Sequence, residues 1–408
     1  MKKVILLLIF CLSSIMIFSQ MSMYIQKSTE LIKFPLIEMD SVTFTGSEGI
    51  YSSLQVHKVN KTTVNATLAD IDNIYFQDED IINEDEFVNK VYITYNGTTA
   101  TITNPFEGAG IDIVQTGAYL VVSSTIEGVE YIVSGTTNNG SLKMYSDYKL
   151  KLTLNGTNIT SNDGPAINIQ CGKRIYVNLP SGTSNTLTDS NNYTVSLGST
   201  EDAKGCFFSE GQLIFSGSGS LYVNANHKNA IRSDDYIRVI DGKITVNKAV
   251  EDGISANGSV IFDGGEANVT VGGDGIKCSK GYIIINAGTI SINSEDEGIV
   301  ASYDPSIETT PDYTIIPYIT INGGTISINT TYPAGTAAAD QRAHGIKTIS
   351  NVTFNGGTTV IFTTGNKSDG INIDGILTLK GGSIMIQAGD DCAKYDSLVD
   401  AGKVLTCL

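Results

Sequence analysis

The sequence predicts an all-β protein whose main body is a right-handed parallel β-helix of about 22–25 residues per coil. A Gly-Ile pair, replaced by Ala230-Ile231 in its first copy and usually preceded by an acid, recurs so that its isoleucines step by 23, 22, 23, 47 and 25 residues from Ile231 to Ile371. A second glycine column precedes short Ile/Val-x-Ile/Val strands, and apolar and polar residues alternate throughout with hardly a helical stretch. The acid-bearing copies are Asp252-Gly253-Ile254, Asp274-Gly275-Ile276, Glu297-Gly298-Ile299 and Asp369-Gly370-Ile371. The second column is Gly242, Gly265, Gly288, Gly324, Gly357 and Gly382, where we expect turns with positive φ.

Residues 1–19 have the features of a secretory signal peptide. Two lysines precede an apolar run from Val4 to Phe18, and Ser19-Gln20 offers a cleavage site. No later apolar stretch is long enough to span a bilayer. We therefore expect an exported protein, secreted or at the cell surface, with no integral membrane segment after cleavage.

Residues 20–87 are predicted to form a small β module with a linker. The segment 39–44 recurs 32 residues later as 71–76, and alternating apolar residues flank both copies, which is typical of short hairpins. Residues 77–86 are acidic and polar, as linkers often are.

The β-helix is expected to occupy residues 88–408, with its regular coils at 149–391. The 47-residue step is one coil with two insertions, near 302–317 and 330–342, and such loops often border the binding surface of a solenoid. The insertions carry Tyr303, Tyr313 and Tyr332. After Asp391 no further Gly-Gly strand follows, so the last coil is expected to be incomplete or differently capped.

Charge and cysteine content narrow the possible partners. The net charge is −17, or −19 once Lys2 and Lys3 leave with the signal, so a nucleic acid is an unlikely partner and cations are favoured. The five remaining cysteines are odd in number and irregularly spaced, which predicts small buried residues rather than a disulfide framework. They are Cys171, Cys206, Cys278, Cys392 and Cys407.

Stacking in register would turn the acid of each repeat into a column of carboxylates at one corner. Two carboxylates about 4.8 Å apart repel by roughly 3–4 kcal/mol at an effective dielectric near 20, so such a column needs compensation. Protonation, nearby lysines or a divalent cation would each supply it. Calcium fits best, since it takes six to eight oxygen ligands. The alternative is that these acids are solvated turn residues, because Asp is common beside Gly, although the constant sign argues for a site.

A basic column runs beside the acids. Arg232, Lys277 and Lys347 each follow the repeat's isoleucine and should point outward onto the same face. They either neutralise the acids or contact a ligand. Lys277 is also the candidate base of a calcium-dependent eliminative lyase, the alternative that we keep open. A hydrolase, which needs two carboxylates with distinct roles, is less favoured.

These repeats resemble a family of secreted bacterial carbohydrate-binding β-helix proteins, first described as a domain of unknown function and similar to pectate-type polysaccharide lyases. The resemblance covers roughly residues 88–391 and rests on the acid-Gly-Ile and Gly-Gly-x-Ile-x-Ile segments. It implies calcium and binding of plant-wall polysaccharide, such as polygalacturonate or cellulose, without firmly implying cleavage. The calcium ligands that it implies are Asp252, Asp274, Asp296, Glu297, Asp369, Asp390 and Asp391. His344 departs from the pattern, because it replaces the acid in the inserted coil.

The sequence therefore predicts a secreted, calcium-binding β-helix that binds an acidic polysaccharide without cleaving it. Two alternatives remain: a calcium-dependent polysaccharide lyase, and a structural or adhesive surface solenoid. The residues expected to contact the polysaccharide are Arg232, Lys277, Lys347, Tyr303 and Tyr332. The oligomeric state is left open.

Overall fold

The computed structural model describes residues 21–27, 30–47, 50–78, 80–194, 201–332, 342–402 and 404–408. The predicted signal peptide and most of the second insertion therefore lie outside the described residues. The chain divides into two compact units, Met1–Glu84 and Asp85–Leu408. In the described part, no helix is long and apolar enough to cross a membrane.

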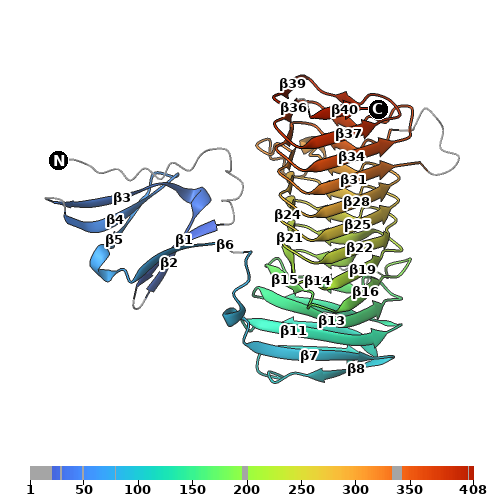
Figure 1. Cartoon of the computed structure of the whole chain (residues 1–408). Coiled ribbons are helices and arrows are strands. Elements are labelled where there is room, and N and C mark those ends of the chain that lie inside the picture. Colours follow the sequence, from blue (N-terminus) through green and yellow to red (C-terminus); the bar gives the residue numbers. More distant parts are fainter. Residues whose placement is uncertain are drawn as a thin grey trace. The chain divides into compact units, whose positions relative to one another are not determined.

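The N-terminal unit contains two three-stranded antiparallel sheets (Figure 1). Met23, Ile25, Phe34, Leu54 and Val56 form most of its buried core. The two matching segments, 39–44 and 71–76, each begin next to a short 3₁₀ helix and continue into a strand of a different sheet. The elements are β1 (Met21–Lys27), β2 (Glu30–Pro35), η2 (Leu36–Glu38), β3 (Met39–Ser47), β4 (Ile50–Lys58), β5 (Thr63–Thr67), η3 (Leu68–Asp70) and β6 (Asn73–Asp78).

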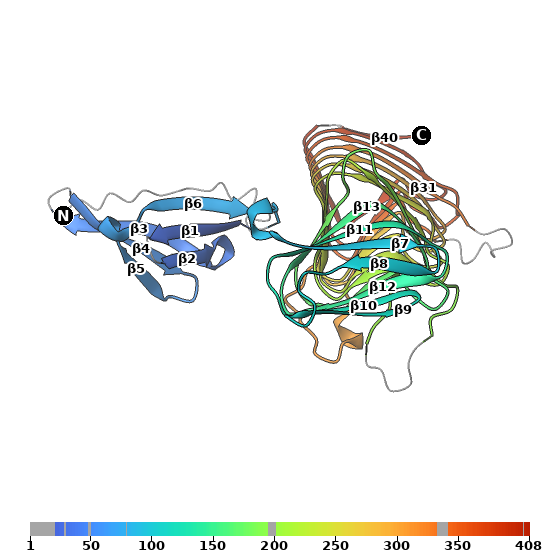
Figure 2. The same ribbon diagram turned by 90° about the horizontal axis from the view of Figure 1, so that it is seen from below.

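The second unit is the predicted parallel β-helix (Figures 1 and 2). It opens after η4 (Glu84–Glu86) with two antiparallel pairs, β7 (Asn89–Asn96) with β8 (Thr99–Thr103) and β9 (Ile111–Thr116) with β10 (Ala118–Ser124). The strands β11 (Val129–Thr137) and β13 (Leu150–Thr160) are long, and β13 pairs with both β15 and β16 of the next coil. From there on each coil has three short strands, stacked in parallel as three faces.

The first face is the twelve-stranded sheet, which holds the Gly-Ile column. After β9 and β10 it comprises β12 (Gly140–Ser146), β14 (Ile167–Ile169), β17 (Gly205–Ser209), β20 (Asn229–Ser233), β23 (Ile254–Ala256), β26 (Ile276–Cys278), β29 (Ile299–Ala301), β32 (Ile346–Thr348), β35 (Ile371–Ile373) and β38 (Ala393–Lys394).

The other two faces belong to one continuous sheet. The second face comprises β15 (Ile175–Asn178), β18 (Leu213–Ser216), β21 (Tyr236–Val239), β24 (Ser259–Phe262), β27 (Tyr282–Ile285), β30 (Tyr318–Ile321), β33 (Val352–Phe354), β36 (Ile376–Leu379) and β39 (Ser397–Asp400). The third comprises β16 (Ser184–Thr188), β19 (Ser220–Asn224), β22 (Lys243–Lys248), β25 (Glu266–Val271), β28 (Thr289–Ser294), β31 (Thr325–Thr330), β34 (Thr358–Thr363), β37 (Ser383–Gln387) and β40 (Leu405–Cys407).

The repeated isoleucines form one ladder inside the coil. Ile231, Ile254, Ile276, Ile299, Ile346 and Ile371 are direct partners on successive strands, and each is fully buried. Burying an isoleucine side chain contributes roughly 1.5–3 kcal/mol, so a ladder of this length supplies much of the driving force for stacking. The spacing of the isoleucines in the sequence therefore equals the length of one coil of the β-helix.

The two glycine columns exist for different reasons. The second column has positive φ throughout, from 73° at Gly265 to 108° at Gly242, as predicted for its turns. In the Gly-Ile column the reason is close approach: a Cβ on Gly275 would lie 2.4 Å from Ile292 Cγ2 and 2.6 Å from the Gly298 carbonyl oxygen. These glycines let the next coil pack directly on the corner.

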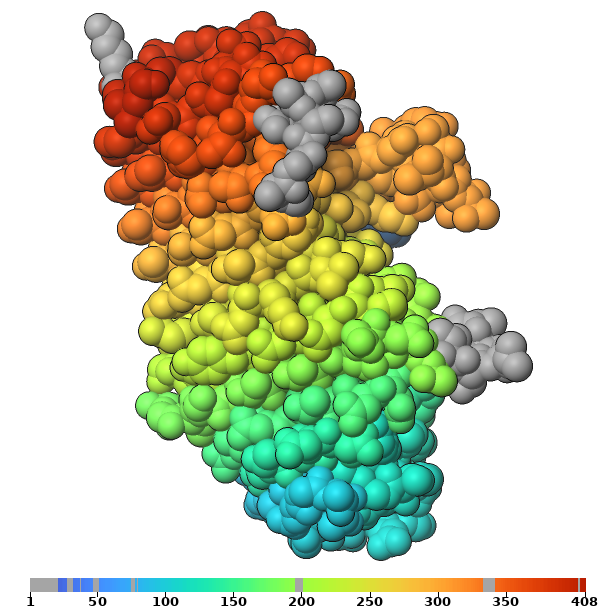
Figure 3. All heavy atoms as spheres, turned by 90° about the vertical axis from the view of Figure 1, so that its right-hand side faces the viewer, coloured from blue at the N-terminus to red at the C-terminus, as the bar shows by residue number. Residues whose placement is uncertain are grey.

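The inserted coil has the predicted arrangement. One insertion separates β29 from β30, the other separates β31 from β32, and η5 (Pro305–Ile307) lies in the first. Figure 3 shows the first insertion (orange) projecting from the body of the β-helix.

The last coil is differently capped, which is one of the two expected arrangements, but its disulfide was not expected. β38, β39 and β40 complete a further lap, and Cys392 and Cys407, separated by 15 residues, form a disulfide that closes it. The irregular spacing of the cysteines in the sequence did not indicate this bond, because the two residues become neighbours only when the lap closes. The other three cysteines, Cys171, Cys206 and Cys278, are free and buried, as expected.

Removal of this disulfide should destabilise the end of the solenoid. A 15-residue closed loop corresponds to about 3 kcal/mol of chain entropy, so the double variant Cys392→Ser/Cys407→Ser should lose about that much stability in its last lap. Because coils of a solenoid contact mainly their neighbours, the loss should be local. Amide hydrogen exchange should quicken in β38–β40 and stay unchanged in β20–β25. Equal exchange in the variant and the parent would contradict this.

Candidate functional site

The predicted acid column exists, and its members are linked through the backbone. An Oδ1 atom of Asp252 accepts a hydrogen bond from the Asp274 N–H (3.2 Å), and Asp274 Oδ1 accepts one from the Glu297 N–H (3.0 Å). Asp369 Oδ1 accepts likewise from the Asp391 N–H (3.1 Å). Each side chain therefore satisfies an amide of the next coil that would otherwise lack a partner at the corner.

The same contact explains the copies without an acid. Asn229 Oδ1 accepts from the Asp252 N–H (3.1 Å), and His344 Nδ1 accepts from the Asp369 N–H (3.0 Å). Burial lowers the pKa of His344 to about 4, although the Asp369 carboxylate opposes this, so the imidazole is neutral and able to accept. The column thus places a hydrogen-bond acceptor at the corner whether or not the residue is an acid, which weakens the argument from constant charge. This holds for Asn229, Asp252, Asp274, His344 and Asp369.

Three carboxylates come together where two acids of one coil meet an acid of the coil beside it. Asp274, Asp296 and Glu297 offer oxygens that all lie within 4.8 Å of one another, and so do Asp369, Asp390 and Asp391. Asp274, Glu297 and Asp369 are buried, whereas Asp296, Asp390 and Asp391 are exposed, so each group has a protected and a solvent-facing side. Of the predicted calcium ligands, only Asp252 lies outside both groups. Its carboxylate binds Lys277 instead, with Nζ 3.4 Å from Oδ2.

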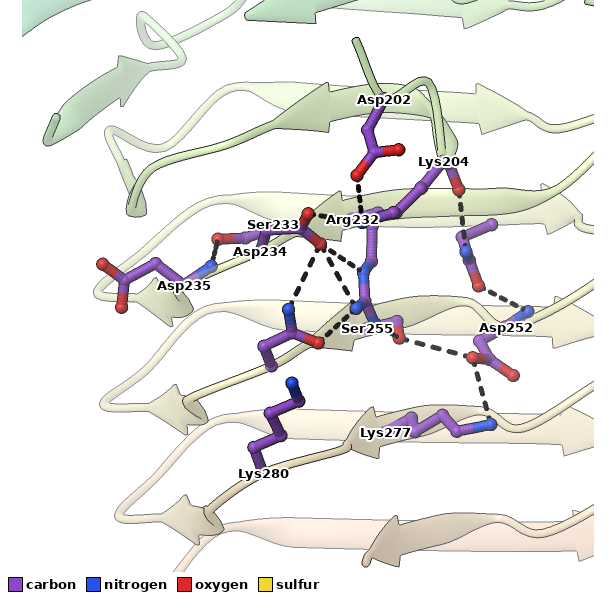
Figure 4. Close-up of polar contacts among 12 residues, drawn as sticks. Asp202, Lys204, Arg232, Ser233, Asp234, Asp235, Asp252, Ser255, Lys277 and Lys280 are labelled. Carbon is purple, nitrogen blue, oxygen red and sulfur yellow. Dashed lines mark hydrogen bonds and ion pairs between the residues drawn. The ribbon is translucent and has the colours of Figure 1, made fainter. Parts of the chain in front are cut away.

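A third carboxylate group was not foreseen. Asp202, Glu210 and Asp234 also bring their oxygens within 4.8 Å, but they lack the acid-Gly-Ile pattern. Lys204 Nζ already lies 2.5 Å from Asp202 and 2.6 Å from Asp234 (Figure 4). Lys204 and Arg232, which also pairs with Asp234, therefore offset part of the charge of this group.

Lysines balance the first acid group. Lys277 Nζ lies 2.8 Å from Asp274 Oδ2, and Lys347 forms an ion pair with Glu297. Burial and the Asp274 charge raise the pKa of Asp252. Burial, a hydrogen bond with Asp296 and the charge of Asp274 raise the pKa of Glu297 to about 9. Without a metal ion, Glu297 therefore holds a proton at neutral pH, and Lys347 then donates a hydrogen bond to a neutral carboxyl group.

Lys277 is poorly placed to act as a base. Burial acts to lower its pKa, but the carboxylates of Asp274 and Asp252 outweigh burial and raise the pKa above its ordinary value. A general base must be unprotonated near the working pH. Held between two carboxylates, Lys277 stays an ammonium group, and the geometry favours charge neutralisation over proton abstraction.

Arg232 is tied into the protein surface rather than presented to a ligand. Its Nη1 donates to Ser255 Oγ (2.8 Å), its Nη2 lies 3.3 Å from Asp234 Oδ1, and it also contacts Asn257. Figure 4 shows this guanidinium lying across the neighbouring strand. Its side chain is only 11% exposed. These contacts hold the guanidinium among protein side chains, and a contact of Arg232 with polysaccharide stays a prediction.

The two predicted tyrosines also have structural partners. Tyr303 is buried, and its hydroxyl accepts a hydrogen bond from the Asp312 N–H (2.8 Å), so it anchors the first insertion and offers almost no surface to a sugar. Tyr332 is half-buried and its hydroxyl lies 2.9 Å from Ser368 Oγ. Burial raises its pKa, and so do the charges of Asp296 and Glu297, which places Tyr332 beside the first acid group.

Comparisons with known proteins identify the family. A family model described as carbohydrate-binding domain-containing protein matches residues 116–392. A carbohydrate-binding domain-containing protein of Acetivibrio thermocellus is 33% identical over 118 residues, which are 28% of this chain and 41% of that protein. The match thus spans less than half the length of this relative.

A solved structure shares the fold. A polysaccharide lyase-like protein from C. thermocellum, described as a gadolinium derivative, superposes with a TM-score of 0.51 at 22% identity, covering 78% of this chain and all of the other. The family match covers more than half of the chain and includes every carboxylate of the two acid groups. The chain belongs to the carbohydrate-binding domain family, and its β-helix has the fold of a polysaccharide lyase-like protein.

Proposed function

We propose that this protein is a secreted, non-catalytic polysaccharide-binding protein that holds an acidic glycan through calcium. The observation that carries the proposal is the pair of three-carboxylate groups at one corner, Asp274/Asp296/Glu297 and Asp369/Asp390/Asp391. The coil register separates them by about three strand spacings, or roughly 14 Å. One extended polymer chain lying along the helix axis would reach both.

Calcium suits these groups better than a softer metal. Every side chain in them offers carboxylate oxygen, the ligand type that calcium prefers. Each group keeps a solvent-facing acid, which leaves coordination positions for water or for a sugar carboxylate. A calcium ion bound there would join two like-charged partners, the acidic protein and an acidic glycan.

Binding without cleavage fits the surroundings of the lysines. Lys277 is paired with Asp252 as well as with Asp274, so it keeps a carboxylate partner beside a bound calcium ion, and an ammonium group in that state does not remove a proton from a sugar. A lyase would show itself by the absorbance of unsaturated uronates. We expect a flat trace with polygalacturonate in calcium, whereas growth of that absorbance would favour the lyase alternative.

Replacing column acids by amides tests the calcium ligands without breaking the corner. In Asp274→Asn and Asp369→Asn the side-chain oxygen remains to accept the amide of the next coil, while one negative charge is lost. Calcium affinity measured by calorimetry should fall at least tenfold in each, since a ligand carboxylate is replaced by a neutral donor. Thermal stability in chelator should change little, because the hydrogen bond survives.

Asp241→Asn is the matched control, because Asp241 is an exposed acid in a turn outside the two acid groups. It should leave calcium affinity unchanged. Polygalacturonate binding should follow calcium affinity and disappear in chelator. Calcium that only raises the melting temperature, with no glycan bound in any condition, would leave the structural solenoid as the better reading.

A further inference from the structure

A series of outward lysines follows the twelve-stranded sheet at every second coil. Lys277, Val300, Lys347, Asn372 and Lys394 are direct partners on five successive strands, β26, β29, β32, β35 and β38. The lysines therefore alternate with uncharged residues. Strands in a sheet lie about 4.8 Å apart, so neighbouring lysines are separated by roughly 9.6 Å and the series spans about 19 Å.

Lys394 extends the basic column beyond what its sequence motif indicated. Cys392-Ala393 stands where other coils have Gly-Ile, which conceals the repeat, but the pairing of Ile371 with Ala393 fixes the register. The charges of both Lys347 and Lys394 act on His344, so the two lysines face the same corner. We call Lys277, Lys347 and Lys394 the lysine series.

These lysines remain accessible, unlike Arg232. The side chains of Lys277 and Lys347 are 31% and 43% exposed, and Lys394 is exposed. Lys277 and Lys347 now pair with Asp274 and Glu297, two of the carboxylates assigned to calcium in the proposed function. A calcium ion on that group would compete for the same oxygens. It would free Lys347 from Glu297, whereas Lys277 would keep the Asp252 carboxylate beside it.

We propose that the lysine series selects an extended polysaccharide with one acidic group per disaccharide, lying along the coil axis over the twelve-stranded sheet. Two strand spacings are about the length of an extended disaccharide, so an anionic group on every second sugar meets a lysine each time. A polymer charged on every sugar would place alternate carboxylates over Val300 and Asn372, beside the acid column, where no cation of the series meets them. This inference rests on the proposed calcium-dependent binding.

Three β-linked polymers test the spacing in calcium: hyaluronan with one carboxylate per disaccharide, fully oxidised cellulose with one on every sugar, and neutral hydroxyethylcellulose. Hyaluronan should bind at least about tenfold more tightly per disaccharide than oxidised cellulose, and the neutral polymer most weakly. Equal or tighter binding of oxidised cellulose would overturn the inference. Failure of both acidic polymers to bind in a calcium-dependent way would instead refute the proposed function itself.

Two variants of the series sharpen this test. Lys347→Gln should weaken hyaluronan binding about tenfold, the effect of one charge-assisted hydrogen bond. Asn372→Lys adds a lysine between Lys347 and Lys394. This lysine would stand three residues after Asp369, just as Lys277 stands three residues after Asp274. It should narrow the preference for hyaluronan over oxidised cellulose by about tenfold.

The control is Lys243→Gln, which removes an outward lysine, paired with Glu266, from β22 on the third face. It should bind both polymers like the parent. Calcium affinity is measured for each variant by calorimetry, so that a lost metal ion is told apart from a lost contact. Identical polymer binding by Lys347→Gln and Lys243→Gln would assign the lysines to charge neutralisation alone.

Discussion

Gly275→Ala is expected to lower the free energy of unfolding by about 4 kcal/mol, above the usual range for overpacking. The added Cβ would meet Ile292 Cγ2 at 2.4 Å and the carbonyl oxygen of Gly298 at 2.6 Å. The isoleucine is buried in the ladder of the third face, and the carbonyl accepts the Ile276 N–H across the coils. Neither can move without opening the stack between β26 and β29.

Gly172→Ala is the control for this effect. A Cβ at Gly172 meets nothing within 4 Å, and its φ does not lie in the left-handed region, so stability should stay within about 0.5 kcal/mol of the parent. Urea unfolding followed by circular dichroism gives both values, since the chain has no tryptophan to report. Equal midpoints for the two variants would show that the corner has room, contrary to the packing described here.

The fold could be predicted from the sequence because every coil packs on its neighbour in the same way. An isoleucine every 22–25 residues and a turn glycine in each lap leave few arrangements other than stacked coils, and the inserted coil keeps both markers. The disulfide between Cys392 and Cys407 could not be predicted, because the prediction relied on these repeated residues. It depends on where the last lap closes, and that lap lacks the markers that set the register elsewhere.

The site was predicted less completely than the fold. The spacing brought Asp274 and Glu297 to one corner, but a one-dimensional pattern does not say what each carboxylate contacts. It counted Asp252 as a metal ligand, whereas the side chain pairs with Lys277 and Ser255. The pattern also grouped Arg232 with Lys277 and Lys347, although the guanidinium contacts side chains that lie on the neighbouring coil in the folded chain. Side-chain direction, not register, decides these cases.

The calcium-free protein is expected to lose stability as the pH rises from about 5 to 9, through Glu297. Burial, Asp296 and Asp274 raise the pKa of this carboxyl group from 4.5 to about 9, although the hydrogen bond with Lys347 acts to lower it. The folded chain therefore holds the proton more tightly than the unfolded chain does. The resulting stability is fully present below about pH 4.5 and is lost towards pH 9, a change on the order of 6 kcal/mol.

Glu297→Gln should flatten this dependence, because the amide imitates the protonated acid and does not titrate. The measurement is the urea midpoint in chelator from pH 5 to 9, with Glu266→Gln as control, since Lys243 lowers the pKa of Glu266 below its ordinary value and that group stays ionised over this range. If the urea midpoint of the parent protein changed with pH no more than that of Glu297→Gln, a group other than Glu297 would be responsible for the pH dependence.

Calcium should remove this pH dependence in the parent protein. A metal ion binds the ionised carboxylate, so the proton on Glu297 must leave first, and calcium affinity should rise with pH until the group is ionised near pH 9. Stability in saturating calcium would then be nearly independent of pH across the interval in which the calcium-free chain weakens. Such a crossover requires one carboxyl group to hold either a proton or a metal ion, which a purely structural turn residue would not produce.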